Sequence, residues 1–165
     1  MVRLTIDGKV VEAKKGTSIL HAAESVGIKI PTLCYIKDLL PDGSCRMCMV
    51  EIENRGRTKM ETACTAQVAE GLVVTTNSEK VRNARRNILD MLLSNHKTDC
   101  FSCPSNGDCK LQELCFEYGI ERTTYSGEQT ELPIDDSNKF FTYNPNLCIL
   151  CHRCVNTCHK VVGRG

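Results

Sequence analysis

One histidine and three cysteines in the middle of the chain have the clearest capacity for chemistry. They follow the spacing H-x3-C-x2-C-x5-C in a segment too short to bury a core of its own. An imidazole and three thiols at this spacing are typical ligands of a metal centre. The sequence therefore predicts a metal site formed by His96, Cys100, Cys103 and Cys109.

Two further sets of four cysteines flank this segment. The upstream set is Cys34, Cys45, Cys48 and Cys64, and the downstream set is Cys148, Cys151, Cys154 and Cys158. Three consecutive sets of four ligands indicate a series of metal centres rather than a substrate pocket. We therefore expect the chain to conduct electrons.

Composition supports metal binding over disulfide formation. The chain has 12 cysteines in 165 residues, and its first residues alternate between apolar and polar types without the apolar stretch of a secretory signal. We expect a cytoplasmic protein, in which thiols stay reduced. No apolar run approaches the roughly 18 residues of a membrane span. Lys and Arg total 21 against 20 for Asp and Glu, so we expect neither nucleic-acid binding nor membrane insertion.

The N-terminal residues predict a small mixed sheet with one helix across it. Segments 2–6 and 9–13 flank Asp7-Gly8, a strong hairpin signal. Thr17 or Ser18 can cap a helix that runs to about Val26 and ends at Gly27. Further strands are expected near residues 47–53 and 72–76.

The first cysteine set falls within this sheet as Cys34-x10-Cys45-x2-Cys48-x15-Cys64. The close C-x2-C pair and the distant fourth cysteine match the plant-type [2Fe–2S] pattern, although the first loop is longer. Here the chain resembles the β-grasp [2Fe–2S] domain of iron-only hydrogenases, the large iron–sulfur subunit of respiratory complex I and NAD-dependent formate dehydrogenases. The alternative is a structural zinc held by four cysteines.

An amphipathic helix of about sixteen residues is expected to begin at Ser78, and His96 is expected to lie at its C-terminal end. Its predicted core stripe is Val81, Ala84, Ile88, Met91 and Leu92. Its first half is basic, with Lys80, Arg82, Arg85 and Arg86, which we interpret as a solvated face; docking against an acidic partner is the alternative.

The histidine–cysteine segment resembles the one-histidine, three-cysteine [4Fe–4S] motif of the same families, including Pro104 and Gly107-Asp108. A neutral imidazole in place of a thiolate is expected to raise the cluster potential, as histidine ligation does in Rieske centres. Zinc is again the alternative. A short helix follows from Lys110 to about Tyr118, and its Cys115 is interpreted as a small buried hydrophobe.

The C-terminal set has the C-x2-C-x2-C-x3-C spacing of bacterial ferredoxins, after a polar loop at 121–139 and an expected strand at 140–143. In two-cluster ferredoxins the fourth cysteine binds the other cluster, and no second quartet follows here. The predicted fourth ligand is Cys158, and the other internal options are Cys115, His152 and His159, in that order. A naturally short subunit is favoured slightly over part of a longer one, and a partner could also supply the ligand.

Nucleotide-binding and catalytic motifs are missing from the sequence. It contains no G-x-G-x-x-G or G-x-x-x-x-G-K-[ST] motif. No catalytic triad is recognisable outside the cysteine sets. Hydrogen-activating and molybdopterin domains are likewise not recognisable. Enzymatic activity of the chain itself is therefore left open.

Together these observations predict an α+β protein in which a β-grasp [2Fe–2S] ferredoxin-like domain precedes helical and loop-rich [4Fe–4S] segments. The expected boundaries are 1–78, 79–125 and 126–165, with one [2Fe–2S] and two [4Fe–4S] clusters. The family resemblance implies an electron-transfer subunit between two partners. One partner would bind flavin and NAD(H) and carry its own clusters, and the other would be a further oxidoreductase subunit.

The resemblance also implies the setting of such a subunit. This would be a soluble NAD(P)-linked complex, such as an electron-bifurcating hydrogenase, a transhydrogenase or a formate dehydrogenase. Two alternatives remain: an N-terminal part of a longer hydrogenase or NADH dehydrogenase subunit, and a zinc-stabilised assembly module without redox role.

Overall fold

The structure is a computed structural model that describes residues 1–127 and 131–164. The chain divides into two compact units, which we describe separately. The first contains residues 1–85 and the C-terminal segment from His152, and the second contains Arg86–Cys151. The predicted domain boundaries remain a prediction.

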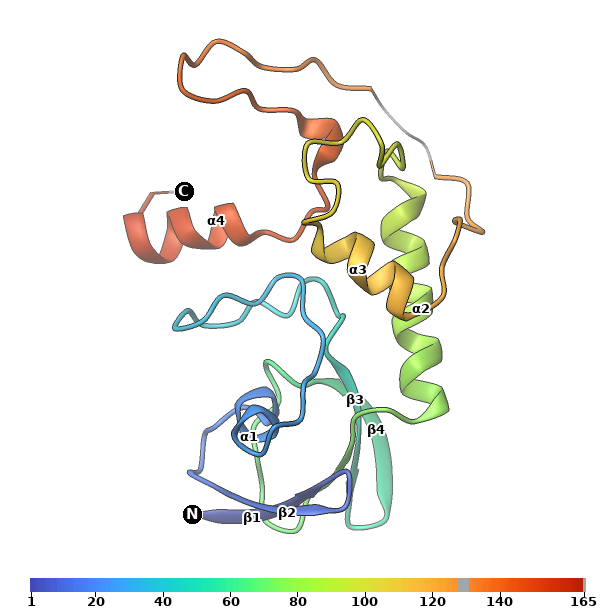
Figure 1. The fold of residues 1–165 in the computed structure, drawn as a ribbon. Helices are drawn as coiled ribbons and strands as arrows, with labels where there is room; N and C mark the ends of the chain where they lie inside the picture. Colours follow the sequence, from blue (N-terminus) through green and yellow to red (C-terminus); the bar gives the residue numbers. More distant parts are fainter. Residues whose placement is uncertain (128–130, 165) are drawn as a thin grey trace. The chain divides into compact units, whose positions relative to one another are not determined.

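A mixed five-stranded sheet forms the first unit (Figure 1). Its spatial order is β2-β1-β5-β3-β4, in which only the β1–β5 pair is parallel. The sheet therefore joins two antiparallel hairpins through a short central strand. The strands are β1 (Val2–Ile6), β2 (Lys9–Ala13), β3 (Met49–Asn54), β4 (Arg57–Thr62) and β5 (Val73–Thr75).

Both hairpins turn through two residues with positive φ. Asp7 and Gly8 have φ of 46° and 79°, which confirms the first predicted hairpin. Arg55 and Gly56 have φ of 50° and 74° and form a second turn of the same kind, which we did not predict from the sequence. Strand β4 was missed because this edge strand is mostly polar and exposed and carries no apolar alternation.

One helix packs on the sheet, as predicted. Helix α1 (Ile19–Ser25) begins after Ser18, whose hydroxyl accepts a hydrogen bond from the His21 N–H, and Gly27 follows it with φ of 76°. Apolar side chains of α1 and of the strands share one core, which fixes the helix on the sheet. The largest of those that are less than 2 % exposed are Leu4, Ile6, Ile19, Val50 and Val74.

Helix α2 (Glu79–Ser94) has the predicted length, and its predicted core stripe is right for Val81, which is buried, but wrong for Met91; the other three predicted positions are half-buried. Met91 is 54 % exposed, whereas the buried side chains follow a four-residue repeat: Val81, Arg85, Leu89 and Leu93. Arg85 is only 3 % exposed, which corrects its interpretation as a solvated residue. Its guanidinium is accommodated because Nη2 donates to the Met49 carbonyl oxygen at 2.7 Å, within the first unit.

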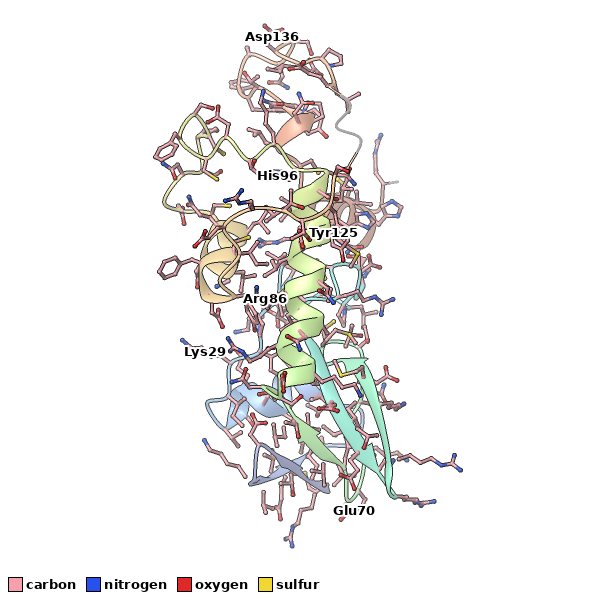
Figure 2. The ribbon with its side chains drawn as sticks, turned by 90° about the vertical axis from the view of Figure 1, so that its right-hand side faces the viewer. Lys29, Glu70, Arg86, His96, Tyr125 and Asp136 are labelled. Atoms are coloured by element: carbon pink, nitrogen blue, oxygen red, sulfur yellow. The ribbon has the colours of Figure 1, made fainter. Side chains whose placement is uncertain are left out.

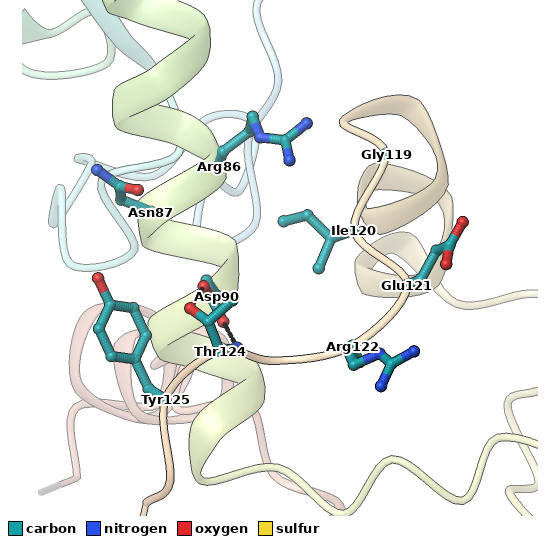
Figure 3. A pocket seen from close by; sticks show the side chains of 9 residues that line it. All are labelled: Arg86, Asn87, Asp90, Gly119, Ile120, Glu121, Arg122, Thr124 and Tyr125. Carbon is teal, nitrogen blue, oxygen red and sulfur yellow. Dashed lines mark hydrogen bonds between the residues drawn. The ribbon is translucent and has the colours of Figure 1, made fainter.

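The second unit is built on the C-terminal part of α2. Helix α3 (Lys110–Glu117) ends at Tyr118, before Gly119 with φ of 65°, and its Cys115 is buried, as predicted. The segment after α3 then returns to α2, where the Asp90 carboxylate accepts hydrogen bonds from Thr123 and Thr124 (Figure 3). These hydrogen bonds to the Asp90 carboxylate therefore hold the segment after α3 against α2.

The C-terminal region contains little regular structure. The strand predicted at 140–143 is wrong: Phe140 lies in a turn and is 83 % exposed, and only a single bridge joins Asp135 to Tyr143. The predicted polar loop is confirmed where it is described, whereas 128–130 lie outside the described residues. The remaining elements are η1 (Pro145–Leu147), α4 (Arg153–Thr157) and η2 (Cys158–Val162).

Membrane-spanning helices are missing from the described part of the chain, since none of its helices combines the required length with the required apolar character.

Candidate metal centres

The sheet of the first unit gathers the first cysteine set, and all four of its cysteines are buried. Cys48 directly precedes β3 and Cys64 follows β4, so the β3–β4 hairpin brings them together although fifteen residues separate them. The ladder continues past the strand ends, because the Ala63 N–H donates to the Cys48 carbonyl oxygen at 3.0 Å. Cys34 and Cys45 lie on the long loop between α1 and β3.

Backbone N–H groups act on the sulfurs of this set. The N–H of Cys34 donates to the Cys45 sulfur at 3.4 Å, and the Cys45 thiol, followed by the N–H groups of Cys45 and Ser44, lowers the pKa of Cys34. The loop can curl in this way because Gly43 and Arg46 have φ of 67° and 58°. Such N–H···S contacts stabilise negatively charged sulfur, as iron ligation requires.

The four thiols interact as two pairs. A hydrogen bond from the Cys45 thiol lowers the pKa of Cys34, and the same bond raises the pKa of Cys45. In the second pair, a hydrogen bond from the Cys64 thiol lowers the pKa of Cys48 and raises that of Cys64. The pairs are therefore Cys34–Cys45 and Cys48–Cys64.

This arrangement fits a [2Fe–2S] cluster, in which each iron takes two of the four protein ligands. In the described part of the chain, no three His, Cys, Asp or Glu side chains form a group that could hold a metal ion. The Ser44 hydroxyl oxygen is buried beside the set and has no hydrogen-bond partner. A buried donor without an acceptor is expected where a cluster sulfur supplies one.

The second set lies around a cavity of about 480 Å³ in the second unit. His96 follows the C-terminal end of α2 (Figure 2), and Cys109 is the N-cap residue of α3. His96, Cys100 and Cys109 line the cavity together with apolar side chains, whereas Cys103 does not. The structure thus brings three of the four predicted ligands to one mostly apolar space.

Burial affects two titratable groups of this cavity. It lowers the pKa of His96, which favours the neutral imidazole that can bind a metal. It raises the pKa of Cys115 to about 11, with smaller contributions from Cys109 and Cys100. Cys115 lies in the cavity wall as a neutral thiol, whereas its place in the sequence indicated only a buried helix face.

The C-terminal set spans the division between the two units. Cys148 and Cys151 belong to the second unit, where the Leu150 N–H donates to the Cys148 sulfur at 3.4 Å. Cys154 and Cys158 belong to the first unit and lie four positions apart on the α4–η2 helix, hence on one face. Ligation by all four, and the choice of Cys158 as fourth ligand, remain predictions.

Comparison with protein families identifies both modules. Residues 1–79 match the family described as a 2Fe-2S iron-sulfur cluster binding domain. Residues 85–124 match the NADH-ubiquinone oxidoreductase-G iron-sulfur binding region. The chain is thus similar to a 2Fe-2S cluster binding domain followed by the iron–sulfur binding region of NADH-ubiquinone oxidoreductase-G. The predicted α+β fold, with its ferredoxin-like [2Fe–2S] domain, is thereby confirmed.

Curated relatives of these iron–sulfur modules come from several oxidoreductases. The chain is 43% identical over 163 residues to the NADPH-Fe(3+) oxidoreductase subunit alpha of Geobacter sulfurreducens. It is 39% identical to the NADP-reducing hydrogenase subunit HndD of Solidesulfovibrio fructosivorans and 37% identical to the NADH-ubiquinone oxidoreductase 78 kDa subunit of Neurospora crassa. The matches cover 98–99% of this chain but only 19%, 28% and 22% of these relatives.

A solved structure shows the same fold. A chain in the crystal structure of an NAD+-reducing [NiFe]-hydrogenase in the H2-reduced state matches with a TM-score of 0.87 and 32% identity. The match covers 95% of this chain and 65% of that one. The family resemblance expected from the cysteine spacings is therefore confirmed for complex I-type and hydrogenase relatives.

Proposed function

We propose that the chain relays single electrons through one [2Fe–2S] and two [4Fe–4S] clusters. Iron–sulfur clusters supply reversible one-electron chemistry when bound. The chain's own residues bind the clusters, exclude water from them and donate hydrogen bonds to their sulfurs. The observation that carries this proposal is the first cysteine set, four buried thiols in two pairs with a backbone N–H that donates to one of the sulfurs.

The proposed ligands follow the three cysteine sets. Cys34, Cys45, Cys48 and Cys64 would hold the [2Fe–2S] cluster, and His96, Cys100, Cys103 and Cys109 the first [4Fe–4S] cluster. Cys148, Cys151, Cys154 and Cys158 would hold the second. The shared cavity supports the central set, and the ferredoxin spacing supports the C-terminal one.

The proposed partners are a flavin- and NAD(P)-binding subunit with its own clusters and a second oxidoreductase subunit. The support is that the relatives are named as subunits of NAD(P)-linked oxidoreductases, including a hydrogenase and a complex I-type enzyme. The terminal reactions belong to those partners, since we find no nucleotide-binding loop in the sequence. An electron-bifurcating complex is one form that such an assembly could take.

Reversible bleaching of the full chain tests this function. Anaerobically prepared protein should be brown, bleach with dithionite and regain its colour on reoxidation. Replacing a proposed [2Fe–2S] ligand, Cys48→Ser, should alter or abolish the [2Fe–2S] signal in electron paramagnetic resonance (EPR) spectra. The matched variant Cys115→Ser should retain that signal. Colourless protein that contains zinc would instead support the zinc-stabilised assembly module.

A further inference from the structure

The Ser44 hydroxyl occupies an unusual position in the first unit. Its oxygen is buried, and among the described residues it is the only buried hydroxyl without a hydrogen-bond partner. Nearby hydroxyls are satisfied: Thr62 and Thr65 bond each other at 2.5 Å, and Thr65 also donates to the Thr62 carbonyl oxygen. An unsatisfied buried hydroxyl costs about 1–3 kcal/mol, so its position requires an explanation.

Cys34 lies beside the loop residue that carries this hydroxyl. Ser44 directly precedes Cys45, and the Cys45 sulfur accepts a hydrogen bond from the Cys34 N–H at 3.4 Å. After the Cys45 thiol, the hydroxyl and the N–H of Ser44 also act on the Cys34 sulfur. A neutral thiol sulfur is only a weak hydrogen-bond acceptor. A negatively charged sulfur in the same place would be a good acceptor.

We propose that the Ser44 hydroxyl donates an O–H···S hydrogen bond to the iron-bound sulfur of Cys34 and raises the reduction potential of the [2Fe–2S] cluster. Reduction adds one negative charge, so a donor aimed at a ligand sulfur stabilises the reduced form more than the oxidised form. Ser44 is then a tuning residue of this centre rather than a packing residue. This inference rests on the proposed ligation by Cys34.

The test is an anaerobic redox titration of the full chain, followed through the EPR signal of the [2Fe–2S] cluster. Ser44→Ala removes the hydroxyl, and Ser44→Thr and Ser44→Val form a second pair of nearly equal size that differs in the hydroxyl. Ser25→Ala is the matched control, because the Ser25 hydroxyl donates to the Ala22 carbonyl oxygen at 2.8 Å. A second measurement counts exchangeable protons coupled to the cluster by pulsed EPR in H2O and D2O.

The inference predicts a lower potential in Ser44→Ala and Ser44→Val than in the wild type, Ser44→Thr and Ser25→Ala. It also predicts one fewer coupled exchangeable proton in Ser44→Ala and Ser44→Val. If only those two variants fail to assemble the cluster, the hydroxyl is needed at the sulfur, in agreement with the inference.

Equal potentials in Ser44→Ala and Ser25→Ala would overturn the inference. So would loss of the cluster from Ser44→Thr as well as Ser44→Ala, because packing would then explain the serine. A wild-type chain without any [2Fe–2S] signal would instead contradict the proposed ligands themselves, and this separates the two failures.

Discussion

His96 differs chemically from the other proposed ligands. Its burial favours the neutral imidazole, which adds no negative charge to a bound cluster, whereas each cysteine adds one. A cluster with one histidine should therefore be easier to reduce than a cluster with four cysteines. This difference makes the assignment of His96 testable by substitution.

We predict that His96→Cys retains a [4Fe–4S] cluster with a lowered reduction potential, because a thiolate increases the negative charge at the iron. An EPR-monitored redox titration measures this shift. Asn95→Cys is the control, since it adds a thiol at the neighbouring exposed position and leaves the imidazole in place. A titration of His96→Cys that matches the wild type would mean that His96 is not a ligand.

Cys115 shows that proximity to a cluster site does not make a residue a ligand. We predict that Cys115→Ala keeps its full iron content and lowers the free energy of unfolding by about 1 kcal/mol, as expected for a shortened buried side chain. Iron analysis and denaturant unfolding check the two effects, with Cys109→Ala as the variant that should lose iron. Loss of iron from Cys115→Ala would make Cys115 a ligand.

At the level of single residues, the sequence predicts ligands better than their surroundings. Cysteine spacing is a local property, and it is sufficient to identify the [2Fe–2S] module. The neighbours of a ligand depend on long-range folding instead. No sequence pattern places the Ser44 hydroxyl at Cys34 or the Arg85 guanidinium at the Met49 carbonyl oxygen.

At the scale of a single element, helix α2 also has buried positions that its local sequence does not predict. Apolar residues at several positions fit a helical repeat, and the stripe predicted from the sequence ends at Met91 and Leu92. The structure buries Leu89 and Leu93 and includes Arg85 on that line. A buried arginine cannot be predicted from periodicity, because it needs a carbonyl acceptor that another element supplies.

Asp90 connects α2 to the segment that follows α3. Hydrogen bonds, first from the Thr124 hydroxyl and then from Thr123 and the Thr124 N–H, lower the pKa of Asp90 below 3.8. A carboxyl group whose pKa is lowered by folding stabilises the protein fully when the pH is above its pKa in the unfolded chain. This stabilisation is lost as the pH falls through its pKa in the folded protein. The contribution should therefore be constant from about pH 5 to about pH 8.

We predict that Asp90→Asn speeds amide hydrogen exchange in residues 120–127 by about fivefold, which corresponds to about 1 kcal/mol of lost local stability. Exchange mass spectrometry at pH 5 and pH 8, corrected for intrinsic rates, measures this effect. Glu121→Gln is the control because Glu121 is an exposed carboxylate of the same segment. If residues 120–127 of the wild type were less protected from exchange at pH 5 than at pH 8, this result would contradict the role of Asp90.

At the scale of the whole molecule, the modules could be predicted and their assembly could not. The hairpin signal, helix cap and cysteine spacings together predict a ferredoxin-like unit followed by a [4Fe–4S] region, and both family matches confirm this. The C-terminal set lies partly in each compact unit, and its ligation remains a prediction.

The curated relatives are longer than the part of them that matches this chain. The chain spans between 19% and 28% of the length of the curated relatives that it matches, so their complete activities involve regions beyond the matched modules. Electron relay is the part of such activity that these modules can perform. The donor and acceptor would be supplied by other regions or subunits.

Iron and acid-labile sulfide per chain, measured with zinc and with EPR after dithionite reduction, test the central claim most directly. One [2Fe–2S] and two [4Fe–4S] clusters predict about ten irons, a matching amount of sulfide and signals of both cluster types. About six irons would leave the C-terminal set without a cluster and remove Cys158 as a ligand in the isolated chain. Stoichiometric zinc in place of iron, with no EPR signal, would contradict electron transfer by this chain.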